Sequence, residues 1–125
     1  MHSIGFITDC TFYTPPSSTL ANGAECFYNI NATLMSCIKI QSSKFYGEKT
    51  ESMNTLSSTI ALLASLNSCI YLEYNKYKNS LDEKIIISGY NYGYVANNEG
   101  LVYPYDTVIT GCISSGLIGA GYSTK

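Results

Sequence analysis

The sequence offers little for nucleophilic catalysis. The single histidine, His2, is the only side chain that could act as the usual base for a Ser or Cys nucleophile. It lies at the extreme N-terminus, where chains are usually loosely held. A conventional Ser hydrolase or Cys protease therefore cannot be assembled from this chain alone, and we expect a protein that is not an enzyme.

Carboxylates are the next candidates for chemistry. Asp9, Glu73 and Asp106 each lie in a β-prone run and could converge on one sheet face, where they would suit acid–base work or a metal ion. The simpler interpretation, which we prefer, is that they are solvated or hydrogen-bonded strand residues. The five Cys form no CxxC pair, so no zinc site is expected. We predict neither a metal nor a cofactor.

Tyrosine is the most informative residue type, with 12 Tyr beside 4 Phe. Alternation places three Tyr on one face of one strand and two on a face of the next, and cross-strand pairing could bring these rings together. They could form a contact surface for another subunit, a sugar or a flat ligand. Alternatively, the rings could fill the second face of the same domain. The residues of this candidate surface are Tyr71, Tyr90, Tyr92, Tyr94, Tyr103 and Tyr105.

Composition narrows the possible partners. Charged residues make up 13% of the chain, the net charge is −2 and Arg is absent, so binding to nucleic acid is not expected. The C-terminal tail is rich in Gly and Ser but still apolar. Within this tail, Leu117 and Ile118 are candidates for packing against a neighbouring subunit.

The cysteines and the N-terminus indicate the cellular compartment in which the protein is made. The Cys count is odd and the spacings are long, which favours buried thiols, with one or two disulfides as the alternative. No secretory signal and no apolar run of membrane-spanning length are present. We expect synthesis in the cytoplasm, with incorporation into a virion or an extracellular assembly as a further step.

One stretch has helical periodicity. In residues 51–67, apolar side chains at Met53, Leu56, Ile60 and Leu63 recur at steps of three and four. This pattern predicts an amphipathic helix with one buried face.

The rest of the chain is typical of strands and turns. Strands are expected in residues 3–14, 25–41 (as one strand or two), 69–78, 84–96 and 101–110. Short connections after the helix favour hairpins. These elements predict one α+β domain over residues 1–125, a mainly antiparallel sheet, flat or curled into a sandwich or barrel, with one helix packed on it. The order is β-β-α-β-β-β, and no internal repeat is evident.

Two functions fit these features. The first is a structural protein that self-associates through Tyr-rich strands and the apolar tail, as a virion, tail or filament subunit. The alternative is a binding module for a carbohydrate or a small molecule, with a pocket lined by Tyr and Asn.

Overall fold

The computed structural model describes residues 3–14, 27–49, 59–73, 84–105, 107–118 and 122–123, and every regular element among them is a β-strand. The strands are β1 (Ser3–Thr8), β2 (Thr11–Tyr13), β3 (Phe27–Ala32), β4 (Ser36–Gln41), β5 (Lys44–Tyr46), β6 (Thr59–Ala64), β7 (Cys69–Glu73), β8 (Ile85–Ser88), β9 (Tyr92–Ala96), β10 (Leu101–Pro104), β11 (Thr107–Thr110), β12 (Ser114–Ile118) and β13 (Tyr122–Ser123). The expectation of a β-rich chain is confirmed.

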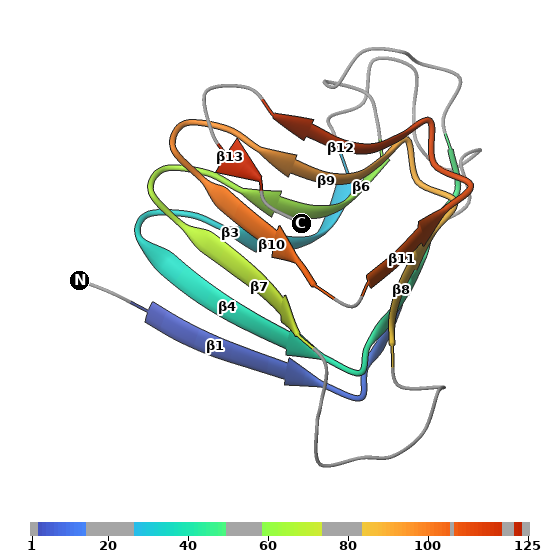
Figure 1. The fold of residues 1–125 in the computed structure, drawn as a ribbon, viewed down its shortest axis with the longest axis horizontal. Coiled ribbons are helices and arrows are strands. Elements are labelled where there is room, and N and C mark those ends of the chain that lie inside the picture. The colour runs from blue at the N-terminus through green and yellow to red at the C-terminus, as the bar shows by residue number, and fades with distance from the viewer. Residues whose placement is uncertain are drawn as a thin grey trace.

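The strands form three sheets in which every pairing is parallel. Sheet A has the order β1-β4-β7-β10-β13, sheet B the order β11-β8-β5-β2, and sheet C the order β12-β9-β6-β3. The chain visits A, B and C in turn and then begins again one strand further along each sheet (Figure 1). The described strands therefore build a three-sided parallel β-solenoid, with four coils and the first strand of a fifth.

A structural repeat of 32–33 residues underlies the solenoid, so the expectation of no internal repeat was wrong. Ser3 pairs with Ser36, Cys37 with Cys69, and Cys69 with Leu101, which gives offsets of 33, 32 and 32 residues. The repeat is visible in the sequence once its period is known. Residues 32–41 read ATLMSCIKIQ and residues 64–73 read ASLNSCIYLE, with five identities in ten positions.

The core consists of apolar side chains stacked from coil to coil. In sheet A, Ile40 on β4 pairs with Leu72 on β7, and both are fully buried. In sheet B, Phe45 on β5 pairs with Ile87 on β8, again fully buried. Side chains alternate between the two faces of a strand, so the residues on either side of each of these core positions point to the outer face of the sheet.

The predicted helix is wrong in its described part. Residues 51–58 lie outside the described residues, while Thr59–Ala64 is the strand β6. The sequence TIALLA is almost continuously apolar, and five of its six residues are buried. A short run of this kind fits the helical period of 3.6 and the strand period of 2 equally well, so periodicity could not decide between them.

The antiparallel sheet and its hairpins were also wrong. Each run that resembled a hairpin arm turns a corner and enters the next sheet instead of folding back. The run over 25–41 is two strands, β3 and β4, in different sheets. Parallel neighbours are separated by a whole coil in the sequence, and local turn signals carry no information about such a pairing.

Candidate functional site

Two of the candidate tyrosines lie inside the solenoid. Tyr90 has no exposed surface, and its hydroxyl donates a hydrogen bond to Oδ1 of Asn29. Burial, with a smaller contribution from the nearby Cys112, raises the pKa of Tyr90 well above its usual value. Tyr94 is 7% exposed and belongs to the hydrophobic core. Both rings fill the interior and leave little surface for a partner.

Three other tyrosines form a stack outside sheet A. The rings of Tyr71 and Tyr103 have centroids 4.6 Å apart and planes inclined by 4°, and Tyr105 continues the stack at 6.5 Å and 12°. Tyr105 is 49% exposed. The in-register pairing of β7 with β10 places Tyr71 directly beside Tyr103. We call Tyr71, Tyr103 and Tyr105 the tyrosine stack.

The remaining candidates lie on sheet C. Tyr92 is half-buried on β9, beside Ile60 of the coil before and Ser114 of the coil after. Leu117 and Ile118 lie on β12, the last strand of sheet C. The structure therefore separates the candidate residues into an internal pair, an outer stack, the half-buried Tyr92 on an inner strand of sheet C, and a strand at one end of the solenoid.

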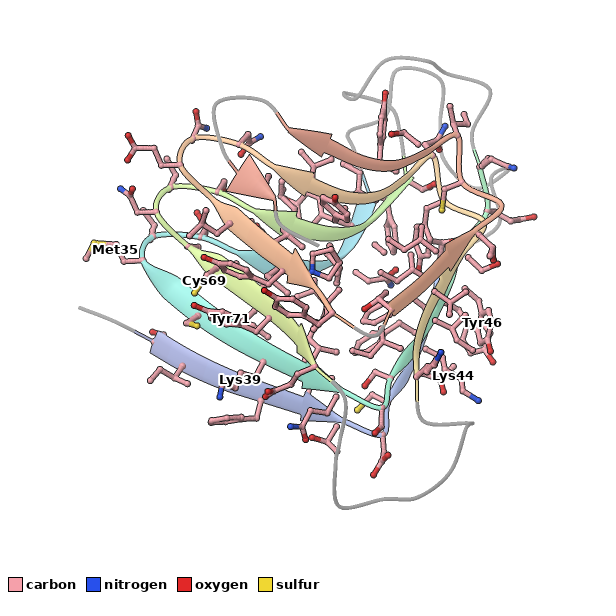
Figure 2. All side chains as sticks on the ribbon, viewed as in Figure 1. Met35, Lys39, Lys44, Tyr46, Cys69 and Tyr71 are labelled. Atoms are coloured by element: carbon pink, nitrogen blue, oxygen red, sulfur yellow. The ribbon has the colours of Figure 1, made fainter. Side chains whose placement is uncertain are left out.

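The outer face of sheet A also carries residues that sequence reasoning missed. On β1, Ile4 is 70% exposed and Phe6 is 72% exposed. The register pairs Phe6 with Lys39. Lys39 is in turn the partner of Tyr71, and both are labelled in Figure 2. Outside sheet B, the rings of Tyr13 and Tyr46 are in tilted contact, with centroids 5.7 Å apart and planes inclined by 31°. The sequence does hold a signal for this contact: Tyr13 and Tyr46 are 33 residues apart, which is also the offset between paired residues of β1 and β4.

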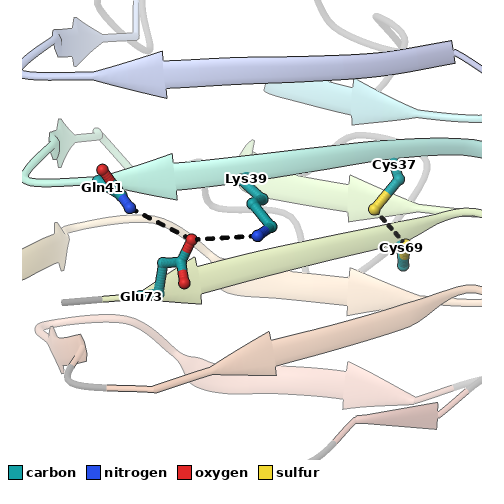
Figure 3. Close-up of polar contacts among 5 residues, drawn as sticks. All are labelled: Cys37, Lys39, Gln41, Cys69 and Glu73. Carbon is teal, nitrogen blue, oxygen red and sulfur yellow. Dashed lines mark hydrogen bonds and ion pairs between the residues drawn. The ribbon is translucent and has the colours of Figure 1, made fainter. Parts of the chain in front are cut away.

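The carboxylate candidates do not converge in the described residues. Glu73 accepts a hydrogen bond from Gln41 at 3.2 Å and lies 3.7 Å from the ammonium of Lys39, which is an exposed ion pair of little energetic weight (Figure 3). Asp9 lies in the turn after β1 with a positive φ of 55°. Asp106 and His2 lie outside the described residues. No group of three or more His, Cys, Asp and Glu that could hold a metal ion occurs in the described part of the chain.

A Ser and a Lys have the spacing of a Ser-x-x-Lys pair, but the strand separates them. Ser36 and Lys39 both lie on β4, where side chains three residues apart point to opposite faces of the sheet. The Ser36 hydroxyl instead donates to the backbone carbonyl of Thr33 at 2.6 Å. The pair therefore cannot act as nucleophile and base.

Polar groups inside the solenoid pair with one another. The backbone N–H of Thr59 donates to Oδ1 of Asn91 at 3.0 Å, and the N–H of Asn91 donates to the Thr59 hydroxyl at 3.1 Å. Both residues are essentially inaccessible to solvent. These bonds link coil 2 to coil 3, so the two side chains have a structural role and are not free for chemistry.

The two ends of the solenoid differ from its middle. In sheet B, the core residues Phe45 and Ile87 of the middle coils are fully buried, whereas Phe12 of the first coil and Ile109 of the fourth are only partly buried. In sheet A, Ile7 of the first coil is likewise partly buried. Among the described strands, β1, β2 and β3 each pair on one side only at the first end, as do β11, β12 and β13 at the other.

No family model, curated protein or solved structure matches this chain. In the described residues no helix is long and apolar enough to cross a membrane.

Proposed function

We propose that this protein is a structural subunit that assembles end to end, with the last coil of one copy stacked on the first coil of the next. The observation that carries this proposal is the incomplete burial of core residues at both ends of the solenoid. Solenoids of this kind need polar terminal caps to remain separate in water. Among the described residues, Phe12 at one end and Ile109 at the other are only partly buried.

Both ends of the solenoid present strands that have one unpaired edge. The first coil ends in the strands β1, β2 and β3, and the fourth coil supplies β11 and β12 on two of the same three sides. In the part of the chain that the structure describes, every strand pairing between coils is parallel. A second copy placed at the same spacing would extend each ladder and cover the exposed part of the core.

End-to-end contact joins two different surfaces, so it does not close on itself after two copies. Such heterologous interfaces give open filaments when no rotation brings the ends together. The apolar tail fits this arrangement, because Leu117 and Ile118 lie on β12 at the end that would receive the next copy. The tyrosine stack remains on the outer surface, where it would line the side of the filament.

The carbohydrate-binding alternative has less support. Sugars stack on the open faces of aromatic rings, and the rings of Tyr71 and Tyr103 already cover one another at 4.6 Å. The two ring faces that meet in this contact are closed to a sugar.

Variants that block one end each test the proposal. Ile7→Lys places a charge at the first coil, and Ile109→Lys places one at the fourth. Each variant alone is expected to be a monomer, because one surface of the contact is lost. Mixed in equal amounts, the two variants are expected to form dimers of twice 13.7 kDa, since each retains the end that the other lacks. Sedimentation velocity measures both results.

Val108→Lys is the matched control. Val108 lies beside Ile109 on β11 but is 40% exposed on the outer side of the sheet. This variant is expected to assemble as the unaltered protein does. Assembly of Ile7→Lys or Ile109→Lys alone, absence of dimers in the mixture, or loss of assembly in Val108→Lys would overturn the proposal. Circular dichroism of each variant verifies that the strand content is unchanged.

A further inference from the structure

Two cysteines from consecutive coils lie side by side on the outer face of sheet A. Cys37 on β4 and Cys69 on β7 are in-register partners, and their sulfur atoms are 2.7 Å apart (Figure 3). Both side chains are partly exposed. The distance is too short for two sulfur atoms in ordinary nonbonded contact and longer than the ~2.05 Å of a disulfide bond.

The backbone permits a bond at this position. Neighbouring strands are ~4.7–4.9 Å apart, which lies within the ~4.4–6.8 Å between Cα atoms of disulfide-bonded residues. The sulfur atoms would need to approach by about 0.7 Å, which small changes in the side-chain torsions can supply. The register isolates the pair, since the next positions in the same row are Ile4 on β1 and Leu101 on β10.

The other described cysteines have different surroundings. The thiol of Cys10 donates to the backbone carbonyl of Thr8 at 3.4 Å, and that of Cys112 to the carbonyl of Thr110 at 3.6 Å. Both are free thiols, and each is engaged within its own turn. Among the described residues, only Cys37 and Cys69 place two sulfur atoms together.

We propose that Cys37 and Cys69 form a disulfide that links the second coil to the third when a small-molecule disulfide is available as oxidant. The thiolate of one cysteine attacks the small disulfide, forms a mixed disulfide and releases one small thiol. The second cysteine then attacks the mixed disulfide and releases the other small thiol. The two protein thiols are oxidised, the small disulfide is reduced, and the two protons end on the released thiols.

The surroundings of the pair set its reactivity. Burial, together with the contact to Cys37, raises the pKa of Cys69 to about 11. Little of Cys69 is therefore thiolate at neutral pH, and the step in which Cys69 attacks is expected to accelerate as the pH rises. Once formed, the bond closes the chain between residues 37 and 69 into a loop and restricts the unfolded state, which stabilises the fold.

Oxidation with glutathione disulfide tests the inference. The reduced protein is incubated with this reagent at pH 8, the remaining thiols are alkylated, and the protein is digested and analysed by mass spectrometry without reduction. The expected product is a peptide pair joined through Cys37 and Cys69. The thermal midpoint of the oxidised protein is expected to rise by several degrees, and reduction should restore the original value.

Single replacements provide the controls. Cys37→Ser and Cys69→Ser are each expected to remove the linked peptide and the rise in midpoint, whereas Cys10→Ser with Cys112→Ser is expected to preserve both. Stable glutathione adducts on Cys37 or Cys69 without a bond between them would overturn the inference. A product in which either residue is linked to Cys26 or Cys112 would do the same. None of these outcomes depends on end-to-end assembly, because the bond lies within one chain.

Discussion

At the residue scale, the interior is shaped by close contacts between aromatic rings and glycine. A Cβ atom at Gly47 would lie 2.6 Å from Cγ of Tyr90, so the fully buried ring packs where any other residue would place a side chain. In the same way, the ring of Tyr94 lies over Gly116 of the next coil, 2.1 Å from where a Cβ would be. Each buried tyrosine therefore depends on a glycine in the neighbouring coil.

Replacing one of these glycines should destabilise the fold. Gly47→Ala forces the Tyr90 ring to move within a filled core, and we expect the free energy of unfolding to fall by about 1–3 kcal/mol. Denaturant unfolding monitored by circular dichroism measures the change. In a Tyr90→Leu background, the added methyl group meets a smaller side chain, so Gly47→Ala should cost less there.

Gly5→Ala is the matched control for this prediction. A Cβ at Gly5 would meet only Cγ1 of Ile38, at an ordinary 3.8 Å. This replacement should therefore leave stability nearly unchanged. Equal effects at positions 47 and 5 would contradict the packing account of Tyr90.

At the element scale, the corner between sheets C and A repeats an unusual backbone. Two consecutive residues have positive φ in each of three coils: Leu34 and Met35, Leu66 and Asn67, and Asn98 and Glu99. The turns also stack, because the N–H of Met35 donates to the Leu66 carbonyl at 3.1 Å and that of Asn67 to the Asn98 carbonyl at 3.2 Å. Hydrogen bonding between coils thus continues around the corner.

The first of the two positive-φ residues in each corner should affect the free energy of unfolding. Leucine is disfavoured at positive φ, whereas asparagine tolerates it and occupies the same position in the next coil as Asn98. Leu66 is 44% exposed, so its replacement sacrifices little burial. Leu66→Asn is expected to raise the free energy of unfolding by about 0.5–1 kcal/mol.

The opposite change at this position is the control. Leu66→Val introduces a β-branched side chain, which is the least suited to positive φ, and should lower the free energy of unfolding by about 1 kcal/mol. Denaturant unfolding of the two variants measures the difference between them. If Leu66→Asn is the less stable of the two, backbone strain does not govern this corner.

Strand positions could be predicted from sequence better than strand partners could. Alternation in residues 25–41 correctly indicated strands, because this signal is local. The pairing of strands one coil apart leaves only a weak signal in the sequence, the 32-residue repeat that places Ser68-Cys69 after Ser36-Cys37. Predicting the tyrosine stack would likewise have required the register between coils. Alternation assigns Tyr71 and Tyr103 to faces, but only the register makes them neighbours.

At the scale of the whole molecule, the chain is a stack of similar coils in which each coil contacts mainly the next. Stability in such a protein is approximately a sum over coils and the interfaces between them. A core position is therefore complete only where a coil lies on both sides, as at Phe45, and incomplete at Phe12 and Ile109. Another copy at each end would provide the missing neighbours.

The most direct test of end-to-end assembly is the solution mass of the unaltered protein. Light scattering over a range of protein concentrations, with reductant present, separates open assembly from a closed oligomer. We predict a mass that rises continuously with concentration and far exceeds 13.7 kDa, with filaments one solenoid wide in electron micrographs. A concentration-independent mass of 13.7 kDa, or of a fixed small multiple, would contradict the account.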